Sequence, residues 1–509
     1  MSEQPTTMRQ WRCVPCGYVH TGNEPPGRCP VCGAGPGDFK PYAAPGTEAA
    51  SGLAQTHWRC LLCNYVHEGP EPPDPCPVCG AEPECFKKVE VEAALATATA
   101  SAATTGRLVI VGSGIAGLAA AEAARVVSPS TEITLVSSEK ELPYYRLNLT
   151  RYLAGEITRD ALPIHPEAWY AEQRIRLLRS AQVTQLDTAA RTVSLADGTA
   201  LPYDRLMLTA GASPNMPPLP GIELDGVFSL RTVTDADALL ARLTPGTPCV
   251  CIGGGVLGIE TAAALARRGA AVTLLERSDW LMQRQLNAAA AAHLERHLRG
   301  IGITILKQAQ TQTLEGEKAL EAVQLVDGRR LPARLAVITI GVRPNIALAH
   351  QAGIKVNTGI VVDNALATSA DGVYAAGDVA EFDGQLYGLW TAAQMQGTIA
   401  GRNAVGGNAR FDGLPRSSTI KAVGLDLTSI GRFQPEDGSE LFLEEDLPDR
   451  YRAFVFRDNR MVGALLVGHA DLATPAQRAI EERLDFSSLL ATAPTCAAIA
   501  EHLLTLSNT

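Results

Sequence analysis

Two regions of the chain repeat one pattern of apolar positions. In the first, the run RLVIV at 107–111 precedes a glycine cluster, the small-residue segment AGLAAAEAAR and a second apolar run, TEITLVSSE. In the second, PCVCI at 248–252 precedes a glycine cluster, VLGIETAAALARRG and AAVTLLE. Short apolar runs predict buried strands, and longer runs of small residues predict helices. We therefore expect two β-α-β nucleotide-binding folds with parallel sheets between residue 107 and about residue 405.

The pattern changes from about residue 413. STIKAVGLDLTSIG and YRAFVFRDNRMVGALLVG predict strands, the latter a pair joined by a turn at Asp458-Asn459. ATPAQRAIEERLDFSSLL at 473–490 predicts a closing helix. These elements indicate a small, separate α+β domain.

The N-terminal part contains an internal repeat. WRCVPCGYVH at 11–20 returns as WRCLLCNYVH at 58–67, and each copy is followed by EPP, CPVCGA and FK in the same order. The segments PYAAPGTEAASGLAQTH and EVEAALATATASAATTG consist mainly of small residues with little to bury, so they predict flexible linkers.

Each repeat has the cysteine spacing C-x2-C-x12-C-x2-C. The candidate ligands are Cys13, Cys16, Cys29 and Cys32 in the first copy and Cys60, Cys63, Cys76 and Cys79 in the second. Four thiolates suit a tetrahedral soft-metal site, for zinc or for a single iron. Because so small a module buries little apolar surface, the metal must supply much of its stability. Folding alone does not choose between the two metals.

The chain length, the net charge, the length of the apolar runs and the first residues limit the class of protein. A chain of 509 residues is too long for one core, so three or more domains are expected. A net charge of −10 argues against a nucleic-acid partner. No apolar run is long enough to span a bilayer, and MSEQPTTMRQ does not resemble a signal peptide. We expect a cytoplasmic protein, in which paired cysteines bind metal more often than they form disulfides.

The glycine clusters predict two dinucleotide sites. A glycine turn lets pyrophosphate approach a helix N-terminus, and an acid at the end of the next strand accepts hydrogen bonds from ribose hydroxyls. A carboxylate at the second site also repels a 2′-phosphate and favours NADH, although Arg277 beside it softens that preference. The residues are Gly112, Ser113, Gly114, Gly117 and Glu139 in the first site, and Gly253, Gly255, Gly258 and Glu276 in the second.

The cysteine repeat WRCxxCGYVHxG…CPVCGA…F resembles the short rubredoxin-like module of rubrerythrins. The resemblance implies a single iron held by four thiolates in each copy, acting as a one-electron carrier.

The region 107–405 resembles the FAD/NAD-linked reductases that are similar to glutathione reductase. The motifs are Thr209-Ala210-Gly211, IGVRPN at 340–345 and VYAAGDVA at 373–380, which contains Gly377 and Asp378. The resemblance assigns FAD to the first fold, with Asp378 on the ribityl chain, and NAD(P)H to the second. Within that superfamily, LPYYRLNLTRYLAGE at 142–156 is similar to a segment of ferredoxin and rubredoxin reductases. This implies further FAD contacts or flavin-proximal residues at Arg146, Arg151, Val183, Ala210 and Trp390, with Arg151 in place of the family lysine. The C-terminal part resembles the end domain of NADH:rubredoxin and nitrite-reductase-type flavoproteins.

The segment 142–156 contains no cysteine, whereas the disulfide reductases of the superfamily need a C-x4-C pair near the flavin and the peroxide-reducing members need one cysteine there. Cys249 and Cys251 lie on the strand that enters the second glycine cluster, where packing is the expected role. Electrons are therefore expected to leave the flavin by outer-sphere transfer.

The predicted fold class is multidomain: two four-cysteine rubredoxin-like modules, an α/β flavoprotein with two dinucleotide-binding domains, and a small α+β domain. The expected boundaries are 9–42 and 57–88 for the modules, 89–106 for a linker, 107–225 and 343–408 for the FAD domain, 226–342 for the NAD(H) domain, and 413–509 for the last domain. The last domain could close the FAD site, form a homodimer or dock a partner.

Matching electron counts favour an NADH:rubredoxin-type oxidoreductase. NADH donates two electrons as hydride, each iron accepts one, and a flavin connects the two. The expected external acceptors, from the family resemblance, are rubrerythrin-like (diiron) or flavodiiron proteins. In an alternative, the modules are zinc ribbons that dock partners while the flavin reduces a separate rubredoxin or ferredoxin. A third, non-redox interpretation keeps the flavin as a structural or sensing cofactor.

Overall fold

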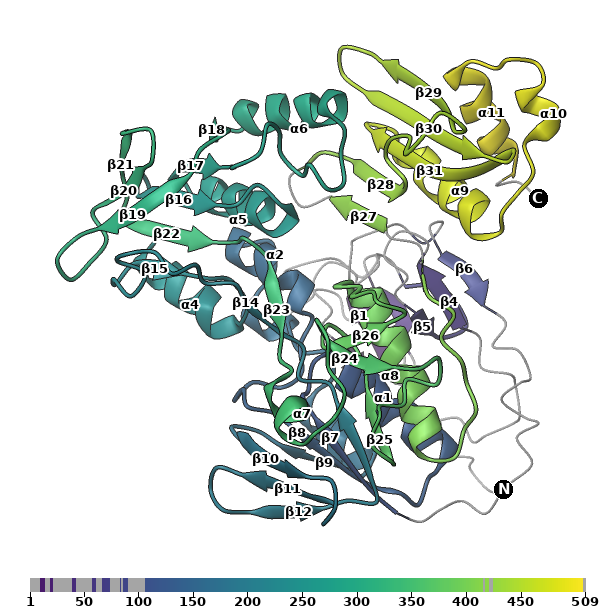
Figure 1. Ribbon diagram of the computed structural model, residues 1–509. Helices are drawn as coiled ribbons and strands as arrows, with labels where there is room; N and C mark the ends of the chain where they lie inside the picture. The colour runs from purple at the N-terminus through teal and green to yellow at the C-terminus, as the bar shows by residue number, and fades with distance from the viewer. Residues whose placement is uncertain are drawn as a thin grey trace, which may run out of the picture. The chain divides into compact units, whose positions relative to one another are not determined.

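We analysed a computed structural model of the 509-residue chain (Figure 1). It describes residues 106–414, 417–420 and 424–506, together with 10–13, 19–21, 39–42, 57–60, 66–73, 83 and 86–89 of the N-terminal part. The expected linkers lie almost entirely outside these residues. By internal contacts the chain divides into two units, Met1–Gln55 and Thr56–Thr509.

The two cysteine repeats form the same small antiparallel sheet. In the first unit the strand order is β2-β1-β3, and in the second repeat it is β5-β4-β6. Trp11 pairs with His20 as Trp58 pairs with His67, and Cys13 pairs with Phe39 as Cys60 pairs with Phe86. The repeat seen in the sequence is thus also a repeat of backbone register. The strands are β1 (Gln10–Cys13), β2 (Val19–Thr21), β3 (Phe39–Tyr42), β4 (His57–Cys60), β5 (Val66–Glu68) and β6 (Phe86–Val89).

The first nucleotide-binding fold is a five-stranded parallel sheet in the order β25-β13-β7-β8-β9. Its core joins residues 108–208 to residues 349–411, so the chain returns to this domain after the second fold. The strands are β7 (Arg107–Val111), β8 (Glu132–Val136), β9 (Ile175–Leu178), β13 (Arg205–Leu208) and β25 (Val373–Ala375). Further elements are β10 (Val183–Asp187), β11 (Thr192–Leu195), β12 (Ala200–Pro202), β14 (Ala212–Pro214), β23 (Val342–Pro344), β24 (Ile360–Val362), β26 (Ala380–Phe382), η4 (Arg146–Asn148), α2 (Leu149–Ala154), η5 (Arg159–Ala161), α3 (Glu167–Glu172) and α7 (Ala347–Gln351).

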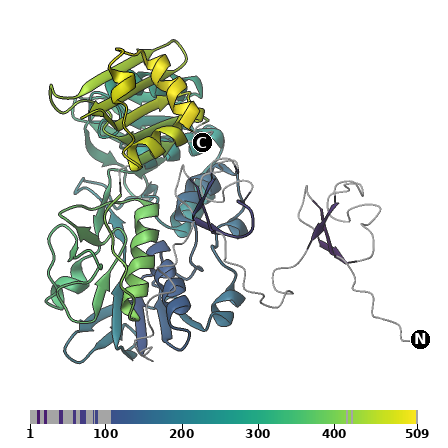
Figure 2. The same cartoon turned by 90° about the vertical axis from the view of Figure 1, so that its right-hand side faces the viewer.

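Helices α1 (Ile115–Val127) and α8 (Trp390–Ala404) run side by side along this sheet (Figure 1, Figure 2). Their small residues permit an unusually close approach. A Cβ at Gly397 would lie 2.2 Å from the carbonyl oxygen of Ala116, and one at Gly401 would lie 2.2 Å from that of Ala120. This backbone-to-backbone contact fixes the N-terminus of α1, where the first glycine cluster lies.

The second nucleotide-binding fold repeats the same architecture. Its parallel sheet has the order β15-β22-β16-β17-β18, with the glycine cluster following the central strand, as in the first fold. The prediction of two parallel nucleotide-binding folds is therefore confirmed. The elements are β15 (Val227–Phe228), α4 (Val233–Arg242), β16 (Pro248–Ile252), α5 (Val256–Arg267), β17 (Ala271–Leu275), α6 (Ala288–Gly300), β18 (Thr304–Leu306), β19 (Thr311–Glu315), β20 (Ala322–Leu325), β21 (Arg330–Pro332) and β22 (Leu335–Ile338).

The C-terminal domain is an antiparallel sheet in the order β27-β28-β31-β30-β29, with helices packed on it. Asp458 and Asn459 both have positive φ, at 51° and 58°, as the two-residue hairpin turn requires. That turn prediction is confirmed. The elements are β27 (Ser417–Ile420), β28 (Leu427–Gly431), β29 (Leu441–Asp446), β30 (Tyr451–Arg457), β31 (Arg460–Val467), α9 (Ala470–Glu481), α10 (Ser487–Leu490) and α11 (Cys496–Leu506).

The prediction of one closing helix over 473–490 is wrong. Helix α9 ends at Glu481, Arg483 takes a positive φ of 51°, and the Asp485 carboxylate accepts the backbone N–H of Ser487 at 2.9 Å as α10 begins. A left-handed residue followed by an aspartate turn ends one helix and starts another. The sequence pattern also did not predict α11.

The C-terminal domain packs on α6 of the second nucleotide-binding fold. Asn287 donates a hydrogen bond to the Tyr451 hydroxyl at 2.6 Å, and His293 Nε2 lies 2.7 Å from an Asp446 oxygen. Apolar residues of both domains share one core cluster around these contacts. The contacts hold the sheet of the C-terminal domain against that helix.

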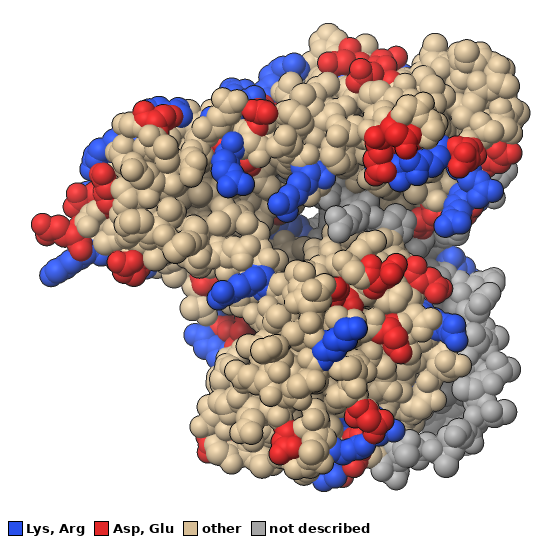
Figure 3. All heavy atoms as spheres, in the orientation of Figure 1, with Lys and Arg blue, Asp and Glu red and all other residues tan. Residues whose placement is uncertain are grey.

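Surface charges of both signs are interspersed on the face drawn in Figure 3. Several of them pair, as Arg452 does with Glu445 at 2.6 Å and Arg432 with Glu436 at 2.7 Å. Opposite charges thus offset one another on the C-terminal domain. Among the described residues, no helix combines the length and apolar character that crossing a membrane requires.

Candidate functional site

The first glycine cluster forms a cradle at the N-terminus of α1. Gly112 has φ of +111°, and a Cβ at Gly117 would lie 1.9 Å from the Gly112 carbonyl oxygen, so no larger residue fits either place. At Gly114, which caps α1, a Cβ would meet nothing within 4 Å. Two glycines are therefore needed by the protein backbone, and the third borders open space at a helix N-terminus. That combination fits a pyrophosphate.

Two side chains brace this turn from neighbouring strands. The Thr209 hydroxyl lies 2.8 Å from the Gly112 carbonyl oxygen and 3.1 Å from that of Val111. Ser113 shares a hydrogen bond with Ser137 at 2.8 Å. Ala210, which follows Thr209, accepts a hydrogen bond on its carbonyl from Asn345 at 2.8 Å. The strand motif at 209–211 thus lies directly against the glycine turn.

Glu139 lies just beyond β8, where an acid was expected, and it is already paired. Its carboxylate accepts hydrogen bonds from the Tyr144 hydroxyl and from Arg146, each at 2.7 Å. Arg146 also donates to the carbonyl of Arg231. Burial would lower the pKa of Arg146, but the contacts with Tyr144 and Glu139 raise it overall. The cation is therefore held in a fixed position beside the expected adenosine end of the site.

The motif VYAAGDVA at 373–380 lies in the same region, although it comes much later in the chain. Gly377 has φ of +84° and donates its N–H to Gln396 at 2.8 Å, while Asp378 forms an ion pair with Arg231 at 3.1 Å. Arg231 thus connects Asp378 to Arg146 through its own carbonyl. Residues 139 and 146, which are close in sequence, thus join the distant residues 231 and 378 in one chain of polar contacts.

Helix α8 presents buried polar atoms without a protein partner. These are Nε1 of Trp390, Oε1 of Gln394 and Nε2 of Gln396. Buried polar atoms are costly unless they are paired, so this set favours a ligand with polar ring edges. The cradle and these atoms together fit FAD. Val183, by contrast, packs as a buried side chain of the domain core, at 6% exposure, and its adenine contact remains a prediction.

The second glycine cluster reproduces the first. Gly253 has φ of +116°, a Cβ at Gly258 would lie 1.9 Å from the Gly253 carbonyl oxygen, and Gly255 caps α5 beside open space. The Thr339 hydroxyl contacts the carbonyls of Ile252 and Gly253 at 3.1 and 3.2 Å, as Thr209 does in the first fold. Thr339 was missed in the sequence, although its place between a buried strand and Gly341 matches that of Thr209.

Glu276 differs from Glu139 in its partners. Its two carboxylate oxygens accept backbone N–H groups from Gly254 at 2.9 Å and from Ser278 at 2.7 Å. The acid is therefore fixed at the edge of the glycine turn, in a position that fits the ribose of a nicotinamide dinucleotide.

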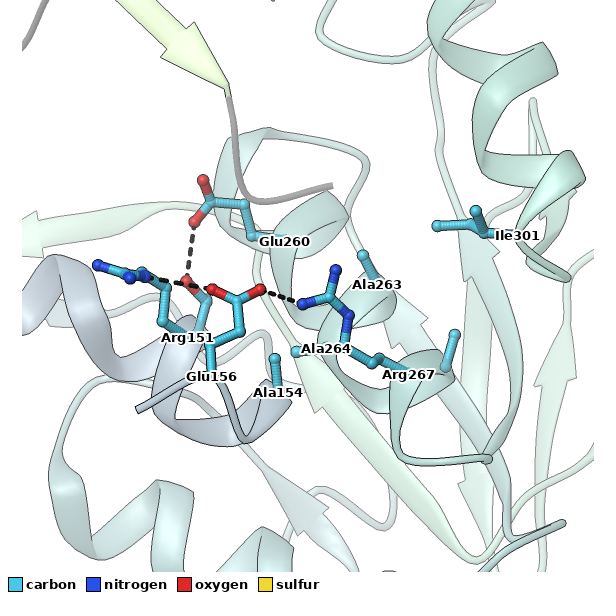
Figure 4. A pocket seen from close by; sticks show the side chains of 10 residues that line it. Arg151, Ala154, Glu156, Glu260, Ala263, Ala264, Arg267 and Ile301 are labelled. Carbon is cyan, nitrogen blue, oxygen red and sulfur yellow. Dashed lines mark hydrogen bonds and ion pairs between the residues drawn. The ribbon is translucent and has the colours of Figure 1, made fainter. Parts of the chain in front are cut away.

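A pocket of about 230 Å³ lies between α2 and α5 (Figure 4). Thr150 donates to a Glu260 oxygen at 3.1 Å, and Arg151 faces Glu156 at 3.2 Å rather than Glu260. Arg267 also pairs with Glu156. The sequence analysis missed Glu260; the available signal was a single acid in the otherwise apolar start of α5. Burial raises the pKa of Glu260 from 4.5 to about 7, and the Thr150 hydrogen bond opposes that shift.

Replacing Glu260 with glutamine is expected to remove a pH dependence of stability. Because the folded-state pKa is raised, the contribution of Glu260 is fully present below pH 4.5 and is lost as the pH rises through about 7. A shift of this size corresponds to about 3 kcal/mol. Urea titrations from pH 4.5 to 8 should therefore show that the stability of Glu260→Gln, relative to wild type, increases by up to that amount. The matched control is Glu321→Gln, which changes an exposed acid of the same domain. A constant difference between Glu260→Gln and wild type would contradict the prediction.

The metal-ligand predictions fall almost entirely outside the described residues. Cys60, at the end of β4, is the one predicted ligand whose side chain is described, and it is fully buried. The other predicted ligands, Cys13, Cys16, Cys29, Cys32, Cys63, Cys76 and Cys79, have no described side chain. Among the described residues no three His, Cys, Asp or Glu side chains gather as a metal site. The donor set, four thiolates in each of two repeats with the same backbone register, fits iron or zinc.

The remaining cysteines pack. Cys249 and Cys251 are buried on β16, where burial raises the pKa of both thiols, that of Cys249 to about 12. Cys496 is buried as well, and burial raises its pKa to about 11. Such thiols are poor nucleophiles, as expected for packing residues.

The fold and the site define a class: a protein with two dinucleotide-binding domains, whose first cradle fits FAD and whose second fits a nicotinamide dinucleotide. The chain belongs to the pyridine nucleotide-disulphide oxidoreductase family, whose family model matches residues 106–397. The rubredoxin-like domain of rubrerythrin matches residues 11–40 and 58–87, and the rubredoxin NAD+ reductase C-terminal domain matches residues 417–484. The chain thus combines the dinucleotide-binding domains of this family with two rubredoxin-like modules and a rubredoxin-reductase-type C-terminal domain, and the family implies FAD and NAD(H).

Known proteins support this assignment. A nitrite reductase [NAD(P)H] of Bacillus subtilis (strain 168) is 32% identical over 75% of this chain and 48% of its own length. An NADH-rubredoxin oxidoreductase of Clostridium acetobutylicum is 29% identical over 75% of this chain and 96% of its own. The putidaredoxin reductase–putidaredoxin complex has a solved chain with a TM-score of 0.72 and 28% identity, covering 80% of this chain and 100% of that one. The chain spans about half the length of the two Bacillus subtilis relatives that it matches, 48% and 47%.

Proposed function

We propose that this protein takes electrons from NADH, passes them through FAD to its own four-thiolate irons, and delivers them to a redox partner protein. The observation that carries the proposal is the presence, in one chain, of two complete glycine cradles and two four-cysteine modules. A bound FAD accepts hydride and releases electrons singly, which matches a two-electron donor to one-electron acceptors.

Each candidate site residue positions one part of FAD or of NADH. Gly112, Gly114 and Gly117 with Ser113 hold the FAD pyrophosphate, and Gly253, Gly255 and Gly258 hold that of NADH. Glu139 and Arg146 orient the adenosine side of FAD, and Asp378, fixed by Arg231, holds its ribityl chain. Ala210 and Gly377 would border a bound isoalloxazine, and Trp390 on α8 would lie beside its ring. Arg151, held by Glu156, supplies a cation near the reacting end.

The domain assignment follows these roles. Residues 107–225 and 343–408 form the FAD domain, 226–342 the NAD(H) domain and 413–509 the C-terminal domain. Within 106–414 the only cysteines are Cys249 and Cys251, both buried in β16, which supports transfer from flavin to metal without a thiol step. Acceptors with diiron or flavodiiron centres, such as a rubrerythrin, fit a one-electron carrier of this type. Cysteines that bind metal, and do not form disulfides, fit the reducing cytoplasm.

Anaerobic titration with NADH tests this proposal. The purified protein should show charge-transfer absorption of ferric thiolate iron beyond that of flavin, and NADH should bleach both. Because one hydride carries two electrons, about one NADH beyond the flavin equivalent should reduce both irons. Two zincs and no iron would favour the alternative, a flavin reductase of a separate rubredoxin or ferredoxin. A flavin that NADH cannot reduce would exclude both.

Cofactor preference gives a second test, at Glu276. The wild-type protein should prefer NADH, because this fixed carboxylate repels a 2′-phosphate. Glu276→Gln keeps an acceptor for one of the two backbone N–H groups and removes the charge, so the ratio of kcat/KM for NADH over NADPH should fall about tenfold, which is about 1.4 kcal/mol. Arg277→Ala is the matched neighbour and should raise the same ratio. If the ratio is unchanged in Glu276→Gln, the ribose does not bind beside Glu276.

A further inference from the structure

One hydrophobic cluster joins three parts of the second unit. It contains Trp58, Cys60 and Phe86 of the second module, apolar residues from the sheet and helices of the C-terminal domain, and Tyr145 of the FAD domain. Cys60 is 0% exposed and Phe86 is 8% exposed. Cys60 and Phe86 are thus buried inside a cluster that the second module shares with the C-terminal domain.

Tyr145 connects this cluster to the proposed flavin site. It precedes Arg146, and its backbone N–H is fixed by the Leu162 carbonyl at 3.0 Å. Its ring lies 5.9 Å from that of Trp390, the residue on α8 with a buried, unpartnered Nε1. The contact surface of the second module therefore continues, through two aromatic rings, into the residues that we assign to FAD.

We propose that the second module is the first electron acceptor, held on the reductase by the contact surface of Trp58, Cys60 and Phe86 against Tyr145 and the C-terminal domain. This inference rests on the proposed function. One electron at a time leaves the reduced flavin, and each reduces one ferric iron to ferrous iron. The second electron of the hydride follows after the first has moved on to the first module or to the partner. No bond to the module forms or breaks.

Two features of the chain favour the second module, and not the first, as the module that binds at this contact surface. Seventeen residues, 90–106, separate β6 from β7, so the module stays at high effective concentration and needs little intrinsic affinity. Its C-x2-C segment is also more apolar than that of the first, with Leu61-Leu62 in place of Val14-Pro15. An apolar contact surface selects the more apolar of two related modules.

Docking removes one ligand of the second metal site, Cys60, from water. Solvent exposure and hydrogen bonds at the thiolate sulfurs tune the potential of such centres. With one ligand removed from water by docking, the second site should differ in potential from the first even though the ligands are the same. The sequence difference between Gly17 and Asn64 adds to this inequality.

Hydroxyl-radical footprinting of the full-length holoprotein tests the contact. The first module is an internal control, because Trp11 and Trp58 hold the same register and pair with equivalent histidines. We expect Trp58 to be labelled several-fold less than Trp11, and Tyr145→Leu to raise the labelling of Trp58 toward that of Trp11. Equal labelling of the two tryptophans in the wild-type protein, or protection of Trp11 instead, would overturn the proposal.

A second pair of variants tests the same contact by the labelling of Tyr145. Trp58→Leu should expose Tyr145 to labelling, whereas the matched Trp11→Leu should leave it protected. Metal content of both variants shows whether each module still folds. If both variants leave Tyr145 equally protected, the second module does not cover it. These readouts do not depend on turnover, so failure of the contact is separable from failure of the proposed function, which the NADH titration detects.

Discussion

Replacing Gly258 with alanine is expected to abolish reduction of the flavin by NADH while FAD stays bound. A Cβ there would lie 1.9 Å from the Gly253 carbonyl oxygen and 2.7 Å from the Thr339 hydroxyl. Because the first contact is with backbone, the turn itself must move, and with it the N–H groups that receive the pyrophosphate. A displacement that costs about 3 kcal/mol of binding corresponds to about a 100-fold loss. We therefore expect kcat/KM for NADH to fall at least about 100-fold.

The first fold supplies the reciprocal experiment. Gly117→Ala places a Cβ 1.9 Å from the Gly112 carbonyl oxygen, and the purified variant should lack flavin yet still bind NADH. Flavin absorbance and quenching of nicotinamide fluorescence measure the two sites separately. Gly300→Ala, at the end of α6 with nothing within 4 Å of the added carbon, controls for a generic effect of alanine. If Gly258→Ala loses flavin as readily as Gly117→Ala does, the two cradles are not independent sites.

Removing one ligand from each module in turn should have an equally large effect. Cys13→Ser and Cys60→Ser each disrupt one four-thiolate set, so each variant should contain one metal where the wild-type protein contains two. If the second module is the first acceptor, NADH should fail to reduce the remaining iron of Cys60→Ser on the millisecond-to-second scale. Cys13→Ser should keep fast reduction of its remaining iron.

Stopped-flow spectroscopy at the ferric charge-transfer band measures these rates, and metal analysis measures the loading. Flavin reduction by NADH is the internal control and should be unchanged in both variants, because neither cysteine lies in a dinucleotide cradle. Similar rates of iron reduction in the two variants would mean that the modules accept electrons in parallel.

The sequence predicts most of the fold because its strongest signals are local. Gly112 and Gly253 take positive φ, Gly117 and Gly258 are required by backbone contacts within the same turn, and the strands before them are continuous apolar runs. The C-terminal hairpin was equally clear, since Asp458 and Asn459 tolerate the positive φ that its turn needs. Such features can be inferred without knowledge of the tertiary structure.

Long-range polar contacts could not be predicted in the same way. The pairing of Arg231 with Asp378 depends on how the chain returns to the first domain after residue 342, and the contact of Arg146 with the Arg231 carbonyl spans 85 residues. Glu260 is unremarkable in sequence, and its raised pKa arises from burial between α2 and α5, which are separated by about a hundred residues. The break after α9 depends on one arginine that takes a left-handed conformation, which arginine seldom does.

The contact between α6 and the C-terminal domain limits which parts of this protein can be exchanged with those of a relative. Asn287 and His293 meet Tyr451 and Asp446 there, and the apolar residues around them belong to one core. A chimaera that takes its last domain from a relative must therefore import α6 with it, or restore those four side chains. The natural point of exchange lies instead in the small-residue segment that follows the first cysteine module, where a new electron carrier could be attached without disturbing a shared core.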